Sequence, residues 1–209
     1  MFDLIQQGGP IMWFMLIAAF MAIVIFLERL FHLHRAQIRS SDFLKGIYTV
    51  LGRGNVAEAV SICEETPGPV AFITRIAVLH HDESPEVIQQ SIEEAGLAEV
   101  PRLERNMNLL ATIAKVTPLA GLLGTVIGML RIFVVMQQHA PLVQIGELST
   151  GMVEALITTA AGLVIAIPSY VGYNFLVGRI ESIVLDMEHA SIDIQGFLSG
   201  KSFQNADEQ

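Results

Sequence analysis

Three long apolar runs dominate the pattern of hydrophobic and polar positions along the chain. They cover residues 10–27, 116–136 and 152–172. Each is long enough to cross a hydrocarbon core about 30 Å thick, which takes roughly 20 apolar residues in a helix. The first run contains no charged residue, and the other two contain one each, Arg131 and Glu154. The pattern predicts a polytopic, all-α membrane protein with three transmembrane helices.

The first apolar run has an alternative interpretation as a cleaved signal peptide. A signal peptide begins with basic residues, whereas residues 1–9 contain Asp3 and no Lys or Arg. The basic residues follow the run instead. Because cytoplasmic flanks of membrane spans are enriched in Lys and Arg, we expect a first span at residues 10–27 with residues 1–9 on the periplasmic side. The basic residues that follow are Arg29, Arg35, Arg39 and Lys45.

Three spans that start from an external N-terminus define the sides of the connecting segments. Residues 28–115 become a cytoplasmic domain, residues 137–151 a periplasmic link, and residues 173–209 a cytoplasmic tail. The link contains no Lys or Arg, in agreement with this orientation. The chain is therefore expected to have a periplasmic N-terminus and a cytoplasmic C-terminus.

The cytoplasmic domain is expected to be helical, with breaks at residues 52–55, 66–69 and 81–85. Ser84 is a candidate N-cap with Pro85 in the first helical position. The apolar face expected for the helix that follows contains Val87, Ile88, Ile92, Ala95 and Leu97.

The second and third spans are expected to extend as helices into the cytoplasmic domain. Ahead of the second span, the chain from Val100 onwards has Pro101 as its one strong interruption. After the third span, apolar residues continue at helical spacing into the tail. These residues are Leu176, Ile180, Ile183, Val184, Met187 and Ile194.

Composition narrows the class of protein. About half of the residues (52%) are hydrophobic, which is typical of a membrane protein. The formal net charge is −9, which we interpret as a solvated acidic surface that does not indicate nucleic-acid binding. The single cysteine, Cys63, excludes an intrachain disulfide, and we expect a buried, unreactive thiol. No metal-ligand motif, phosphate-binding loop or catalytic triad spacing is present, so we expect no metal, no cofactor and no enzyme activity.

Small residues share one face of each of the last two spans. In the second span Gly121, Gly124, Thr125 and Gly128 follow at i, i+3, i+4 and i+7, and such faces let helices approach closely. The third span repeats the pattern in Gly151, Ala155, Thr159, Gly162 and Ala166. We assign helix packing to Gly121, Gly124, Gly128, Gly162, Pro118 and Pro168.

Arg131 and Glu154 need a physical reason to lie in apolar runs, because an unpaired charge there costs about 2 to 3 kcal/mol. The second span runs outward and the third inward, so both residues fall at similar depth in the outer half of the bilayer. They are candidates for an ion pair, within one subunit or between subunits. The alternative is that each reaches water separately.

Thr125 and Thr159 fall near the middle of their antiparallel spans. A membrane threonine commonly donates its hydroxyl hydrogen bond to the carbonyl one turn back in its own helix. From the residues alone this local role is the alternative to any role in a polar pathway.

Two segments make the sequence resemble a known family. TPLAGLLGTVIGML at residues 117–130 and MVEALITTAAGLVIAIPSYVGYN at residues 152–174 are similar to the signature of the ExbB/TolQ/MotA family. The GGP ahead of the first span, NVAEAV at residues 55–60 and PRLERNMNLLATIA at residues 101–114 resemble it as well. Three spans favour the ExbB/TolQ branch, since MotA members have four.

The resemblance implies a homopentamer in the bacterial inner membrane. The ring would surround two copies of a single-span ExbD-like or TolR-like partner, which supplies the protonatable aspartate. The family's pore-facing threonines correspond to Thr125 and Thr159, and its third-span acid to Glu154. The resemblance thus assigns these three residues to the proton pathway or pore lining. The pairing of Arg131 with Glu154 is our own inference and is not implied by the family.

The function implied is that of an ExbB-like subunit that couples the proton motive force, through a TonB-like protein, to outer-membrane transport. Two alternatives remain. One is a TolQ-like subunit of the Tol-Pal envelope system, working on a TolA-like protein. The other is a membrane scaffold that holds a partner and conducts nothing.

Overall fold

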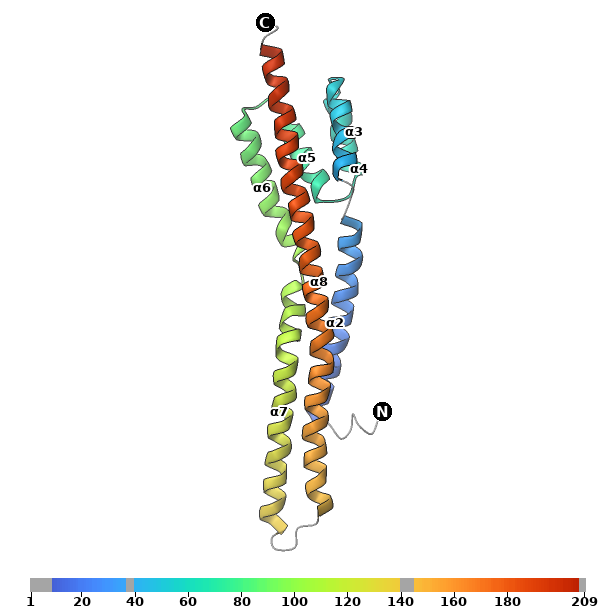
Figure 1. Cartoon of the computed structure of the whole chain (residues 1–209), viewed down its shortest axis with the longest axis vertical. Coiled ribbons are helices and arrows are strands. Elements are labelled where there is room, and N and C mark those ends of the chain that lie inside the picture. Colours follow the sequence, from blue (N-terminus) through green and yellow to red (C-terminus); the bar gives the residue numbers. More distant parts are fainter. Residues whose placement is uncertain (1–8, 37–39, 140–144, 207–209) are drawn as a thin grey trace. The chain divides into compact units, whose positions relative to one another are not determined.

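The described part of the chain consists of helices joined by short turns and contains no strand. The computed structural model describes residues 9–36, 40–139 and 145–206. Figure 1 shows the helices in chain order. They are α2 (Gly9–Ala36), α3 (Ser40–Gly52), α4 (Val56–Glu65), α5 (Pro69–Leu79), α6 (Pro85–Leu103), α7 (Met107–His139) and α8 (Ile145–Ala206).

Three of these helices, α2, α7 and α8, are long and apolar enough to cross a membrane. Each contains one of the predicted spans and is longer than it. Their large apolar side chains are largely exposed, for example Phe20 at 69% and Val164 at 70%. Exposed apolar surface on this scale is expected when the surroundings are lipid or other protein rather than water. Residues 1–8 of the predicted periplasmic N-terminus (1–9) and residues 140–144 of the predicted link (137–151) lie outside the described residues.

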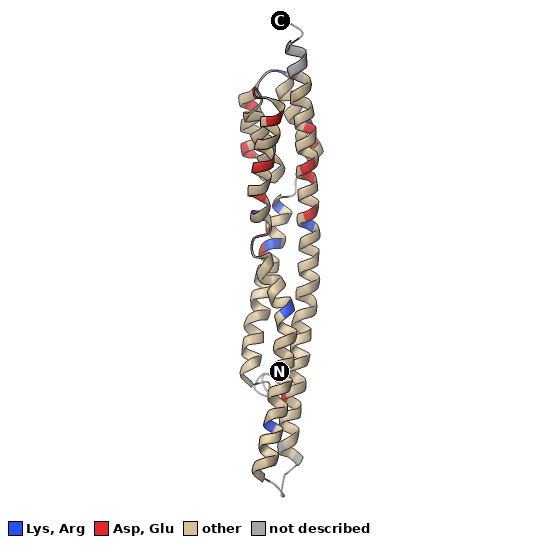
Figure 2. Ribbon diagram, turned by 90° about the vertical axis from the view of Figure 1, so that its left-hand side faces the viewer, with Lys and Arg blue, Asp and Glu red and all other residues tan. Residues whose placement is uncertain are grey.

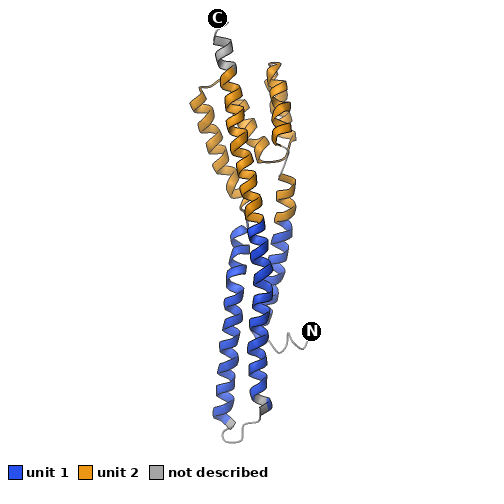
Figure 3. Ribbon diagram, in the orientation of Figure 1, with its two compact units in different colours: residues 1–28, 106–175 blue, residues 29–105, 176–209 orange. Residues whose placement is uncertain are grey.

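The chain divides into two compact units, coloured separately in Figure 3. Unit 1 comprises residues 1–28 and 106–175, and unit 2 comprises residues 29–105 and 176–209. Unit 1 therefore holds most of the apolar length of the three long helices. Figure 2 shows that most Asp and Glu residues belong to the helices of unit 2.

In unit 1, helix α7 begins at Met107, directly after Asn106, which has a positive φ of 64°. The Asn106 side chain donates to Glu28 Oε2 at 3.3 Å. The predicted helix from Val100 into the second span is therefore wrong. Helix α6 ends at Leu103, and asparagine accepts the left-handed conformation that a turn requires.

In unit 2, the short helices have the predicted breaks between them. Residues 53–55, 66–68 and 80–84 separate α3, α4, α5 and α6. The Asn55 side chain accepts from the backbone N–H of Glu58 and so caps α4. Ser84 occupies the N-cap of α6 with Pro85 following it, although its side chain makes no capping hydrogen bond.

The buried face of α6 differs in part from the prediction. Ile88, Ile92 and Ala95 are buried as expected, but Leu97 is 76% exposed and Val87 41% exposed. Helical geometry gives the reason. Leu97 lies nine residues after Ile88, half a turn away from the face that Ile88 defines.

The tail of α8 has the predicted apolar stripe. Among the expected residues Val184 is half-buried and the others are buried. Near the end of the stripe the ring of Tyr48 stacks on Phe197, with ring centroids 4.6 Å apart. The C-terminal part of α8 thus contributes core to unit 2. The buried residues are Leu176, Ile180, Ile183, Met187 and Ile194.

Candidate functional site

Helices α7 and α8 meet in unit 1 along a seam of glycines that brings their backbones into contact. A Cβ added to Gly124 would lie 2.3 Å from Thr158 Oγ1. One added to Gly128 would lie 2.7 Å from the carbonyl oxygen of Gly151. No real Cβ fits at such distances, so the two helices approach as closely as glycine permits.

The seam continues toward the N-terminal end of α7 and further along α8. A Cβ on Gly162 would lie 2.9 Å from the carbonyl oxygen of Thr117, and one on Gly121 would lie 3.0 Å from that of Thr158. The two prolines assigned to packing differ from the glycines. Pro118 is half-buried within α7, whereas Pro168 is exposed within α8.

Thr125 of α7 and Thr159 of α8 are joined by a hydrogen bond between their hydroxyl groups. Both hydroxyls also lie within reach of the Gly121 carbonyl oxygen, at 3.3 Å from Thr125 and 3.2 Å from Thr159. Thr159 Oγ1 lies 3.1 Å from the carbonyl oxygen of Ala155 as well. Two hydroxyl protons thus serve four contacts, so the donor can change by rotation of a hydroxyl. The local and the cross-helix arrangements are both present.

Two other hydroxyls of α8, those of Thr158 and Ser169, are occupied within their own helix. Thr158 donates to the Glu154 carbonyl at 3.0 Å, and Ser169 donates to the Ile165 carbonyl at 2.7 Å. Both follow the usual pattern of membrane threonine and serine. The cross-helix bond therefore distinguishes Thr125 and Thr159 from these two hydroxyls.

Arg131 of α7 and Glu154 of α8 form an ion pair within one chain, through Arg131 Nη1 and Glu154 Oε2. The two side chains are unequally exposed, at 55% for Arg131 and 7% for Glu154. The carboxylate is buried, and the guanidinium reaches the surface of the chain. The pair neutralises a charge that would be costly in an apolar environment.

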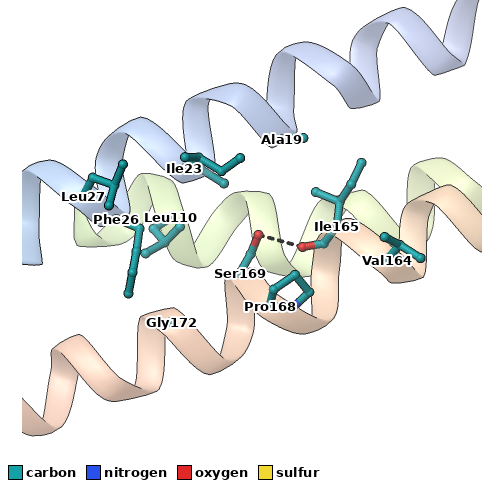
Figure 4. A pocket seen from close by; sticks show the side chains of 11 residues that line it. Ala19, Ile23, Phe26, Leu27, Leu110, Val164, Ile165, Pro168, Ser169 and Gly172 are labelled. Carbon is teal, nitrogen blue, oxygen red and sulfur yellow. Dashed lines mark hydrogen bonds between the residues drawn. The ribbon is translucent and has the colours of Figure 1, made fainter.

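Unit 1 also contains an apolar cavity of about 360 Å³, formed where α2 and α8 face each other near Leu110 of α7 (Figure 4). The Ser169 hydroxyl is satisfied by the Ile165 carbonyl, as the dashed line in the figure marks. The remaining lining is almost entirely apolar. None of the residues that line the cavity is ionisable. Within the described residues, no cluster of three or more His, Cys, Asp or Glu is placed to hold a metal ion.

One residue of this region was not assigned a role from the sequence. Gly9 begins α2 with a positive φ of 65°, and a Cβ added to it would lie 2.6 Å from Glu154 Oε1. The GGP motif that contains it was noted only as a family resemblance. A glycine directly before a proline at the start of a helix was the available signal.

Comparison with known proteins places the sequence among proton channels. The profile of the MotA/TolQ/ExbB proton channel family matches residues 66–189, which is more than half of the chain. The matched range includes the glycine seam, the threonine pair and the ion pair.

Named relatives agree with that match. The chain is 41% identical over 86 residues to the biopolymer transport protein ExbB of Aquifex aeolicus, covering 41% of this chain and 57% of that protein. It is 32% identical over 136 residues to the Tol-Pal system protein TolQ of Haemophilus influenzae, covering 64% and 59%. It is 25% identical over 180 residues to a putative ExbB homolog of Methanothermobacter thermautotrophicus, covering 86% and 63%. The alignments thus span less than two thirds of each relative.

Proposed function

Because the chain belongs to the MotA/TolQ/ExbB proton channel family, we propose that it is the ring-forming subunit of a proton-driven motor of the inner membrane. The ring is a homopentamer around two copies of an ExbD-like or TolR-like single-span partner, and the partner's aspartate carries the proton. Its orientation has the N-terminus in the periplasm and unit 2 in the cytoplasm. The basic residues that follow the first span support this orientation.

The observation that carries the proposal is the hydroxyl pair of Thr125 and Thr159. The pair is half-buried, spans the two helices and shares two protons among four contacts. Such a group can accept from a protonated carboxyl and donate to a carboxylate without introducing a fixed charge. A partner aspartate is thereby solvated at this level in either protonation state.

The energy comes from proton movement down the membrane potential. One charge crossing the membrane releases about 2.3 kcal/mol per 100 mV. Protonation of the partner's aspartate removes its charge and lets it move past the apolar wall on either side of the threonine pair. Release of the proton on the cytoplasmic side restores the charge, and repeated cycles move the partner helices within the ring.

The work is passed to a TonB-like protein, and the chain serves outer-membrane transport as an ExbB-like subunit. The two ExbB relatives support this assignment. A TolQ-like role in the Tol-Pal system, with a TolA-like protein, is the second candidate, and the Haemophilus relative favours it. In a non-conducting scaffold the hydroxyl pair would serve only as a packing contact between two membrane helices, so proton flux distinguishes the scaffold from the motor.

The test is proton flux into liposomes that contain this chain with and without its ExbD-like partner. We expect flux that requires the partner and that falls by about tenfold or more in Thr159→Val, because loss of a hydrogen-bonding group costs about 1 to 3 kcal/mol. Thr159→Ser retains the hydroxyl and restores most of the flux. Thr150→Val is the matched control, since Thr150 is an exposed residue of the same helix that contacts its own Gly146 carbonyl.

Two results would oppose the proposal. Equal flux in wild type and Thr159→Val would remove the hydroxyl pair from the pathway. Absence of partner-dependent flux in wild type, with the complex intact by size-exclusion chromatography, would favour the scaffold.

A further inference from the structure

The start of α2 lies against the buried carboxylate of Glu154. Helix α2 begins at Gly9, and Pro10 follows in the first turn. A Cβ added to Gly9 would lie 2.6 Å from Glu154 Oε1 and 3.7 Å from Glu154 Cδ. A side chain at this point would therefore require the Glu154 carboxylate to move from its present position.

The location suits a negative charge. The first turn of a helix has backbone N–H groups without intrahelical partners and carries the positive end of the helix dipole. Arg131 of α7 contacts the other carboxylate oxygen, Oε2. The Glu154 carboxylate therefore lies between the start of α2 and the Arg131 guanidinium, and its side chain is only 7% exposed.

Gly9 has a second reason to be glycine. Its φ of 65° lies in the left-handed region, which residues with a Cβ adopt at a cost. In this backbone conformation, the position that a Cβ of residue 9 would occupy lies next to the Glu154 carboxylate. Strain and contact are separate requirements, and they can be tested separately.

We propose that Gly9 is a positioning residue of the proton channel, which acts by seating the Glu154 carboxylate against the first turn of α2. The seat fastens α2 to the α7–α8 seam at the level of the Arg131–Glu154 pair, and so holds the threonine pair of these helices in register. It accounts for the glycine of the GGP motif. The expected change in proton flux rests on the proposed function, whereas the contact between Gly9 and the Glu154 carboxylate does not.

The primary experiment is a double-mutant cycle of Gly9→Ala and Glu154→Asp, measured as partner-dependent proton flux in liposomes. Asp is shorter than Glu by one methylene and withdraws the carboxylate from an added Cβ. We expect Gly9→Ala to lower the proton flux of the otherwise wild-type protein. In the Glu154→Asp background, the fold-loss of flux caused by Gly9→Ala is expected to be at least about threefold smaller, because the effects of mutating two residues in contact are not independent. Independent effects of the two changes would overturn the proposal.

Gly54→Ala is the matched control for backbone strain. Gly54 also has a positive φ, 77°, but a Cβ added to it would meet no atom within 4 Å. The control therefore carries the strain of a left-handed alanine without the collision. We expect Gly54→Ala to retain nearly wild-type flux, and equal losses in Gly54→Ala and Gly9→Ala would attribute the effect to strain alone.

A chemical readout separates this proposal from the proposed function. A hydrophobic carbodiimide modifies protonated carboxyl groups in apolar surroundings, and mass spectrometry of the peptide that contains Glu154 measures the extent. We expect little modification in wild type and Gly54→Ala, and at least about threefold more in Gly9→Ala, where the carboxylate is displaced from the first turn of α2. This result is independent of whether the wild type conducts protons.

Accumulation in the membrane provides a further outcome. If Gly9→Ala alone does not accumulate as a folded protein, the double variant with Glu154→Asp is expected to do so. The proposal that Gly9 positions the Glu154 carboxylate would be overturned if the double variant also did not accumulate. Equal carbodiimide modification of wild type and Gly9→Ala would overturn it as well.

Discussion

The hydroxyl side chains of unit 1 differ in their hydrogen bonding, because some face only their own helix and others also face a hydroxyl of the neighbouring helix. Thr158 and Ser169 complete their hydrogen bonding with a carbonyl of their own helix, as membrane hydroxyls usually do. Thr125 and Thr159 likewise each contact the carbonyl oxygen one turn back in their own helix, and in addition they are hydrogen-bonded to each other. The difference comes from Gly121, whose lack of a side chain brings the two hydroxyls together.

The unequal burial of Arg131 and Glu154 predicts unequal effects of removing either one. Arg131→Met leaves a carboxylate in a site that is 7% exposed, whereas Glu154→Gln leaves a guanidinium that is 55% exposed and able to reach water. We expect Arg131→Met to destabilise the protein by at least about 2 kcal/mol more than Glu154→Gln.

Thermal unfolding of the purified protein in one detergent measures this difference for both variants. Arg131→Lys is the control that keeps the charge. Equal losses in Arg131→Met and Glu154→Gln would show that the pair contributes through contact alone and that the buried charge is not the dominant cost.

Cys63 is predicted to react slowly with thiol reagents. The side chain is buried in unit 2, and burial, with a smaller contribution from Glu64, raises the pKa of the thiol to about 11 against the opposing effect of Arg75. Near pH 8 the reactive thiolate is therefore roughly 100-fold or more scarcer than for a free cysteine with a pKa of about 8.5.

Maleimide labelling at pH 8 checks this, with and without denaturant. We expect slow labelling of the native protein and rapid labelling after unfolding. Ser41→Cys in a Cys63→Ala background provides an exposed thiol for comparison. A native Cys63 that reacts as fast as this exposed thiol would contradict the expected burial.

The packing of α7 on α8 depends on glycine at each closest approach. A Cβ at Gly124 would overlap Thr158 at its Oγ1 and, at 2.5 Å, its Cβ, so the collision involves the root of a β-branched side chain that cannot rotate away. We expect Gly124→Ala to separate the helices locally and to destabilise the protein by about 1 to 3 kcal/mol, as overpacking does.

Gly178→Ala on α8 is the matched control, because its Cβ would meet no atom within 4 Å. Alanine in an open helical position is favoured over glycine by about 1 kcal/mol, so this variant should be at least as stable as wild type. Thermal unfolding of both variants is the measurement. A Gly124→Ala protein as stable as Gly178→Ala would show that the seam can open at little cost.

The sequence predicted these elements wherever a local rule decides them. The three long helices follow from apolar length, and the breaks of unit 2 follow from the turn-forming residues at 52–55 and 66–69 and from the N-cap candidate Ser84. The turn at Asn106 was missed because no glycine or proline occupies it. Leu97 was misplaced because its face depends on an angle that accumulates over several turns. Gly9 was missed because its requirement comes from Glu154, which is far away in the sequence.

The two units differ in the environment that each suits. Unit 1 has apolar side chains outward and only a few charges among its described residues, whereas the helices of unit 2 carry most of the Asp and Glu (Figure 2). An acidic, charged surface requires water, and an apolar one of this extent requires lipid or protein. The proposed orientation assigns unit 2 to the cytoplasm.

Site-directed labelling tests this orientation. Single cysteines at the exposed positions Gly146 and Glu188, introduced into a Cys63→Ala background, are expected to face opposite sides of the membrane. A membrane-impermeant maleimide should label Gly146→Cys in right-side-out spheroplasts and Glu188→Cys only in inverted vesicles. The reverse pattern would place the N-terminus in the cytoplasm.

The glycine seam of α7 and α8 also limits how this protein can change over generations. At Gly124, Gly128 and Gly162 any other amino acid adds a Cβ where the backbone or a rigid side chain of the opposite helix already lies. A viable alternative there needs simultaneous changes on both helices, which arise far less often than single ones. Positions that are exposed on the single chain, such as Phe20 and Val164, meet no such close backbone within it and can vary more readily among apolar residues. Among homologues of this chain, we therefore expect the glycines of the seam to vary least and the exposed apolar positions to vary most.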